Sequence, residues 1–223
     1  MTKPYYQDDY VTLYHGDALE VREWLTADVL VTDPPYGMAY VSNQRAGGTD
    51  PMAGDQDPVA RDRALEMWGD RPAIVFGTWR VPRPPTTRQV ITWWKRKVGP
   101  GMGDLRMPWG NSTEEIYVLG DGFTGRRRPN VIVTDELRSG SSGLASQVDH
   151  PTPKPVGLME QLIECCPPGV VADPFAGSGA TLLAARNLRR RAIGVEINER
   201  YCEVIARRLS QDVLAFDVAE AGA

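Results

Sequence analysis

The sequence V-V-A-D-P-F-A-G-S-G at residues 170–179, continuing as A-T-L-L-A-A-R-N-L, decides the fold class. It predicts a buried strand that ends at Asp173, a turn that contains glycines, and a helix that begins near Thr181. Gly177 and Gly179 permit positive φ angles and a close backbone approach where a side chain would clash. Open α/β sheets bind ligands at the carboxyl ends of their strands, where this turn is expected. Taken alone, the turn is as consistent with tight packing as with a ligand site, because it matches neither the dinucleotide fingerprint nor the phosphate loop.

Strand and helix patterns alternate along the rest of the chain. Apolar runs of strand length lie at residues 11–14, 28–32, 73–76, 89–94, 115–119, 170–172 and 192–195. Helical patterns lie at residues 57–68, 155–166, 181–190 and 199–210. This order predicts a doubly wound α/β fold, with helices on both faces of a mostly parallel sheet. The length of 223 residues suits one domain over residues 1–223, with a mobile, glycine-bearing loop at 37–56.

Composition argues against several functional classes. The three cysteines show no C-x-x-C spacing and the chain has only two histidines, which argues against a disulfide framework and against a metal site. No apolar run approaches the roughly 20 residues of a membrane span, and the N-terminus lacks the pattern of a signal peptide. We therefore expect a cytoplasmic protein with no metal and no membrane partner.

Charge is distributed unevenly. The whole chain has a net charge of -4, but residues 80–130 contain ten basic and four acidic side chains. A basic centre in an acidic body is compatible with one face that binds nucleic acid. It is equally compatible with an ordinary solvated surface.

Two acidic residues follow predicted strands. Glu196 comes about twenty residues after the glycine turn, where a carboxylate can accept hydrogen bonds from both hydroxyls of a ribose. Asp33-Pro34-Pro35-Tyr36 follows the strand at 28–32, and its prolines cannot continue the sheet. Such a stiff turn could hold a carboxylate and a carbonyl that accept both N–H groups of an exocyclic amine, while Tyr36 stacks on a base. The alternative is a rigid turn with a packed tyrosine.

Together these motifs resemble the amino-group DNA methyltransferases over most of the chain. Residues 33–36 match that family's catalytic motif, residues 173–179 match its S-adenosylmethionine loop, and Glu196 matches its ribose-binding acid. H-P-T-P-K-P at residues 150–155 is similar to the cofactor motif that precedes the loop, and Gly16-Asp17 lies where the family contacts the cofactor's adenine. The catalytic motif comes first and the cofactor loop last, which is the circularly permuted order of the beta class.

The resemblance implies a seven-stranded sheet of the S-adenosylmethionine-dependent methyltransferase type, and transfer to the amino group of a base flipped from double-stranded DNA. The implied catalytic residues are Asp33, Pro34, Pro35 and Tyr36. The implied cofactor-binding residues are Asp17, Asp33, Thr152, Lys154, Asp173, Phe175, Gly177, Ser178, Gly179, Thr181 and Glu196.

DNA contacts are expected in the basic centre. The candidates are Lys95, Arg96, Lys97, Arg126, Arg127 and Arg128. The three consecutive arginines lie in residues 120–149, the place of the family's target-recognition region, which is short here. The family often dimerises, so a homodimer is a further expectation of the resemblance. Its members act in the cytoplasm of bacteria, often in restriction–modification systems, or are encoded by phages.

Several alternatives remain open within this interpretation. The target is adenine N6 or cytosine N4, and aspartate at the first motif position favours adenine in this family. RNA and protein-glutamine methyltransferases typically have asparagine there and the opposite motif order. Carbon-5 cytosine methylation needs a Pro-Cys nucleophile, and this chain has the reverse order at Cys166-Pro167. A non-catalytic DNA-binding protein on the same fold is the alternative from a different functional class.

Overall fold

A computed structural model describes residues 2–35, 59–96, 106–135 and 153–220, with only the backbone described for residues 212–220. Its strands are β1 (Tyr6–Gln7), β2 (Val11–His15), β3 (Val29–Thr32), β4 (Ala73–Gly77), β5 (Thr87–Lys95), β6 (Thr113–Leu119), β7 (Val131–Thr134), β8 (Val171–Asp173) and β9 (Ala192–Glu196). Its helices are η1 (Glu23–Thr26), α1 (Val59–Trp68), α3 (Val156–Ile163), α4 (Ala180–Asn187) and α5 (Glu199–Glu220).

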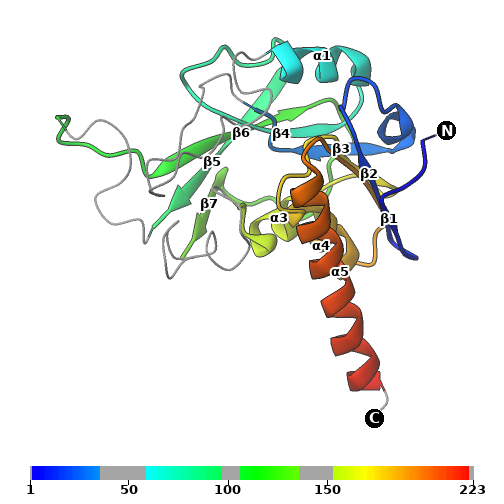
Figure 1. Ribbon diagram of the computed structural model, residues 1–223. Helices are drawn as coiled ribbons and strands as arrows, with labels where there is room; N and C mark the ends of the chain where they lie inside the picture. Colours follow the sequence, from blue (N-terminus) through cyan, green and yellow to red (C-terminus); the bar gives the residue numbers. More distant parts are fainter. Residues whose placement is uncertain (1, 36–58, 97–105, 136–152, 221–223) are drawn as a thin grey trace.

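The strands form a single sheet in the order β1-β2-β9-β8-β3-β4-β6-β5-β7 (Figure 1). The five strands from β2 to β4 in this order pair in parallel. β6 is antiparallel to both β4 and β5, and β7 is parallel to β5. The predicted doubly wound, mostly parallel α/β fold is confirmed.

The sheet has two strands more than the seven expected. Each of the seven predicted strands is present, and β1 and β7 are added as the two outermost strands. β1 has only two residues, too few to carry a pattern, and pairs antiparallel with β2. β7 corresponds to a short apolar run inside the segment 120–149, and it pairs with the second half of β5. The described part of the predicted recognition segment therefore extends the sheet.

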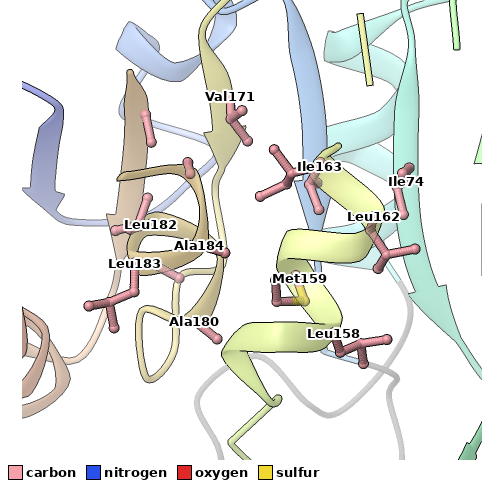
Figure 2. Close-up of a cluster of buried hydrophobic side chains, with 14 of the residues drawn as sticks. Ile74, Leu158, Met159, Leu162, Ile163, Val171, Ala180, Leu182, Leu183 and Ala184 are labelled. Carbon is pink, nitrogen blue, oxygen red and sulfur yellow. The ribbon is translucent and has the colours of Figure 1, made fainter. Parts of the chain in front are cut away.

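Alternating side chains on the central strands build two hydrophobic cores, because successive residues of a strand point to opposite faces. Val29 and Val31 of β3 belong to a core with α3, α4 and the first part of α5, whereas Leu30 belongs to a core with η1 and α1. Figure 2 shows the first core, where α3 and α4 pack beside each other against β4 and β8. This burial on both faces explains why the central strands have continuous apolar sequences rather than alternating ones.

One edge of the sheet collects the ends of most strands. The parallel strands β2, β9, β8, β3 and β4 all end there, and β5 ends there too because it is antiparallel to β6, which is antiparallel to β4. β6 begins at the same edge. We call this the carboxyl edge and the opposite one the amino edge. All the predicted catalytic and cofactor residues that are described lie at or near the carboxyl edge.

Candidate active site

The Asp33 elbow, residues 33–35, and the glycine turn, residues 174–179, occupy adjacent strand ends. β3 and β8 pair directly, with Val29 opposite Val171. At their ends, the Thr32 hydroxyl donates a hydrogen bond of 2.7 Å to Asp173 Oδ1. The two motifs, 140 residues apart in sequence, therefore lie side by side at the carboxyl edge, on neighbouring strand ends as predicted. Tyr36 and Thr152, also predicted for this site, lie outside the described residues.

Asp173 holds this junction together from inside the protein. Its side chain is buried, and its Oδ1 accepts a bond from the Phe175 amide at 3.2 Å as well as the one from Thr32. Burial raises the pKa of Asp173 to about 6, while hydrogen bonds from Thr181, Thr32 and Phe175 favour the ionised form and partly oppose the shift. These contacts tie the start of the turn to β3.

The glycine turn requires glycine for conformational reasons. Gly177 and Gly179 have φ angles of +53° and +80°, a region that residues with a Cβ atom seldom adopt. A Cβ at Gly179 would also lie 2.9 Å from Ile205 Cγ1 of α5. Gly179 is the N-cap of α4, and Ser178 and Thr181 beside it are buried. The sequence-based interpretation of this turn is confirmed in its backbone.

Glu196 closes the other side of the turn. Its carboxylate accepts hydrogen bonds from the Gly177 amide at 2.7 Å and from the Asn198 amide at 2.9 Å. Burial raises the pKa of Glu196 to about 7, while these two amide bonds lower it. Each carboxylate oxygen has more than one acceptor direction, so the group can bind further donors.

Asp17 lies beside Glu196 at the end of the neighbouring strand. β2 and β9 pair so that His15 is opposite Glu196, and the Gly16 amide donates to the Glu196 carbonyl at 3.0 Å. Asp17 Oδ1 accepts the Leu19 amide at 2.8 Å, which fixes the chain as it leaves β2. Four adjacent strands therefore carry these groups at their ends: Asp17 follows β2, Glu196 ends β9, and the glycine turn and the Asp33 elbow follow β8 and β3.

Lys154, which the cofactor motif predicted to contact the cofactor, lies against the Asp33 elbow. Its Nζ atom lies 2.5 Å from Asp33 Oδ2 and 3.3 Å from Glu114 Oε2. Burial alone lowers the pKa of the Lys154 ammonium, but the charges of Asp33 and Glu114 outweigh it and raise the pKa above its usual value.

Glu114 is a site residue that the sequence did not reveal. It is the second residue of β6, its Oε1 also pairs with Lys95, and its Oε2 makes no well-oriented hydrogen bond among the described residues. Burial raises the pKa of Glu114, but Lys154 and Lys95 outweigh this effect and lower it below the usual value. In sequence, Glu114 and Glu115 look like a polar strand start, and only the fold brings Glu114 to Lys154.

Comparison with known proteins decides the family. A profile of the N6/N4 DNA methylases matches residues 76–207, which include the glycine turn and Glu196. The protein YubD of Escherichia coli (strain K12) is 32% identical over 215 residues, covering 87% of this chain and 88% of YubD. The chain belongs to the N6/N4 DNA methylase family. It is therefore an S-adenosylmethionine-dependent DNA methyltransferase, as the motifs predicted.

Further relatives of this DNA methylase cover almost the whole chain. The type II methyltransferase M.ScaI of Streptomyces caespitosus is 26% identical over 260 residues, covering 94% of this chain and 84% of M.ScaI. The crystal structure of an M1.HpyAVI-SAM complex superposes with a TM-score of 0.62 at 23% identity, covering 89% of this chain and 98% of that one. The likeness to M1.HpyAVI shows that this chain and M1.HpyAVI share the same fold.

The predicted DNA contacts of the methylase fall at two places. Lys95 and Arg96 are at the carboxyl edge, but they form ion pairs with Glu114 and Asp135 respectively. Arg126, Arg127 and Arg128 are exposed and lie toward the amino edge, where the Thr124 amide bonds the Cys165 carbonyl beyond the end of α3. Lys97 lies outside the described residues.

Metal and membrane signals are lacking in the part of the methylase that the structure describes. Within those residues, no group of three or more His, Cys, Asp or Glu side chains could hold a metal ion. None of the described helices combines the length and the apolar character that crossing a bilayer requires.

Proposed function

We propose that this DNA methylase transfers the methyl group of S-adenosylmethionine to the N6 amino group of adenine in double-stranded DNA. The observation that carries the proposal is the adjacency of the Asp33 elbow and the glycine turn, joined by the 2.7 Å bond between Thr32 and Asp173. The Asp33 elbow suits the amine that receives the methyl group, and the glycine turn suits the nucleoside part of the cofactor that donates it. The aspartate at position 33 favours adenine over cytosine within this family.

The residues present fit the cofactor. Glu196 is an anionic acceptor at a strand end, beside the Gly177 amide and next to Asp17 on the adjacent strand. This is the arrangement in which open α/β sheets hold a ribose and the base attached to it. M1.HpyAVI, which has the same fold, was solved as a complex with S-adenosylmethionine. When bound, S-adenosylmethionine would supply the methyl group: the C–S bond would break as the amino nitrogen forms the new N–C bond, sulfur would keep the electron pair in S-adenosylhomocysteine, and the nitrogen would lose one proton.

On the acceptor side, the Asp33 elbow would orient the target amine. The Asp33 carboxylate and the Pro34 carbonyl would accept its two hydrogens, which directs the nitrogen lone pair away from the elbow. The side chain of Asp33 is 25% exposed, whereas that of Lys154, which it contacts, is 9% exposed. Catalysis here is positioning and electrostatics rather than covalent chemistry.

The test is a nucleoside analysis of methylated DNA. Unmethylated DNA is incubated with the protein and labelled S-adenosylmethionine, digested, and separated by mass spectrometry. We expect labelled N6-methyladenine. Labelled N4-methylcytosine would establish the alternative target, and no label in DNA would refute the proposal.

The relatives support a proposal about the cellular setting. M.ScaI is a type II methyltransferase, so we propose that this protein also modifies a specific site, in the bacterial cytoplasm. We propose a homodimer as well, as is frequent in the family. Sedimentation velocity would distinguish a dimer from a monomer of 24.6 kDa.

A further inference from the structure

We propose that Lys154 is a positioning residue for Asp33, and that Glu114 in turn holds Lys154. The Lys154 ammonium binds one oxygen of the Asp33 carboxylate and thereby fixes its orientation towards the target amine. This inference rests on the proposed function, because it assigns a role in that same site. It differs from the cofactor contact that the sequence motif suggested for Lys154.

Four charged side chains from four segments of the protein form one continuous series of ion pairs. Lys154 Nζ lies 2.5 Å from Asp33 Oδ2 and 3.3 Å from Glu114 Oε2, and Lys95 pairs with the other Glu114 oxygen. Asp33 follows β3, Glu114 is the second residue of β6, Lys95 ends β5, and Lys154 precedes α3. Asp33 continues the alternation of Val29 and Val31, which places it on the α3 side of the sheet.

The Lys154 ammonium is buried, so it depends on its charged partners for stabilisation. The Lys154 side chain is only 9% exposed, and its ammonium lies 5.1 Å from the centre of the Phe76 ring and 6.0 Å from that of Trp93. An ammonium among apolar rings needs charged partners, because water cannot replace them. Two positive and two negative groups sum to no net charge, so the chain of ion pairs is compatible with this environment.

The backbone around Lys154 is stiff. Pro153 and Pro155 flank it, and each proline fixes its own φ angle and restricts the residue before it. Pro155 is the N-cap of α3 and the carbonyl of Pro155 accepts the amides of Leu158 and Met159. Lys154 is therefore anchored to a buried helix, which suits a group that must hold another group in place.

A charged partner also serves the proposed chemistry of Asp33. An ionised carboxylate only accepts hydrogen bonds, whereas a protonated one carries a donor that would face the amine hydrogens. Lys154 Nζ, 2.5 Å from Asp33 Oδ2, is a cation placed directly against the carboxylate that would accept the amine hydrogens.

The experiment compares three variants with the wild-type protein. Lys154→Met removes the charge and keeps the stem, Lys154→Arg keeps a charge, and Glu114→Gln neutralises the group behind Lys154. Arg190→Met is the matched control, because Arg190 is a half-buried cation that bonds the carbonyls of Gly169 and Pro167 at the amino edge. S-adenosylmethionine affinity is measured by calorimetry, and the single-turnover rate at saturating cofactor and DNA by label incorporation across pH.

We expect Lys154→Met to slow the single turnover about 100-fold, which is the usual effect of a misplaced catalytic group, with cofactor affinity changed by less than about three-fold. Lys154→Arg should recover part of the rate, and Arg190→Met should retain the wild-type rate.

Two results would overturn the proposal. One is weaker cofactor binding with an unchanged saturated rate in Lys154→Met, which would make Lys154 a cofactor residue. The other is a wild-type rate and pH profile in that variant. If Lys154→Met does not fold, Glu114→Gln decides, with about a ten-fold slower turnover supporting the proposal and an unchanged rate refuting it. No methyl transfer by the wild-type protein would instead refute the proposed function.

Discussion

The raised pKa of Glu196 gives the cofactor affinity a pH dependence that can be calculated in advance. Burial raises the pKa to about 7, and ribose hydroxyls donate more strongly to the carboxylate than to the neutral acid. A ligand that binds only the ionised form would bind about ten-fold more weakly at pH 6 than at pH 8, which is about 1.4 kcal/mol. Affinity should therefore rise with pH through 7 and then level off.

The assay is isothermal calorimetry with S-adenosylmethionine between pH 6 and pH 8. Glu196→Gln keeps the volume of the side chain and cannot ionise, so its affinity should be lower at pH 8 and nearly constant over this range. The comparison between the two proteins cancels the titration of the cofactor itself. Asp173→Asn is the second control, because the pKa of Asp173 is also raised, to about 6, by burial.

Two outcomes would refute this reasoning. A wild-type affinity that does not change with pH would show that the ligand is indifferent to the charge of Glu196. An equal pH dependence in Glu196→Gln would assign the effect to another group. Either result would remove the main support for the ribose-binding role.

Three further predictions concern stability and DNA binding. Gly179→Ala should destabilise the protein by about 1–3 kcal/mol in urea unfolding, because of the φ of +80° and the contact with Ile205, whereas Gly157→Ala in α3, with open space around it, should be neutral or stabilising. Because the folded-state pKa of Glu196 is raised, its contribution to the free energy of unfolding is complete below about pH 4 and is lost as pH rises through 7. Unfolding measured at pH 4 and at pH 8 should show the loss of this contribution, on the order of 3 kcal/mol, and the loss should be absent in Glu196→Gln. Replacing Arg126, Arg127 and Arg128 by alanine should reduce the magnitude of the slope of log affinity against log salt by less than about 0.9, which is the contribution of one phosphate contact. A reduction equal to about three contacts would show that DNA reaches the amino edge.

Local patterns in the sequence predicted the parts of the protein that depend on local chemistry. The strand, turn and helix around Asp173 and Gly179 could be read directly, because positive φ angles at glycine and a buried apolar strand are properties of adjacent residues. The proximity of Asp33 to the glycine turn followed from both motifs ending parallel strands. Helix boundaries were less accurate: Pro155 is the N-cap of α3 rather than its first residue.

Contacts between distant segments could not be predicted in the same way. Asp33, Glu114 and Lys154 lie on three segments far apart in sequence, and nothing in their local sequences specifies that they meet. The position of the three consecutive arginines depends on the antiparallel β6, which returns the chain to the amino edge before β7 begins. Residue type suggested the charge of a DNA-binding surface, but only the topology shows on which side of the sheet that charge lies.

The most direct test of the central claim is Asp33→Ala, assayed for both methyl transfer and S-adenosylmethionine binding. If the Asp33 elbow holds the target amine while the neighbouring turn holds the cofactor, transfer to DNA should fall by roughly 10²–10³-fold or more, with cofactor affinity nearly unchanged. Transfer at the wild-type rate by this variant would contradict the account.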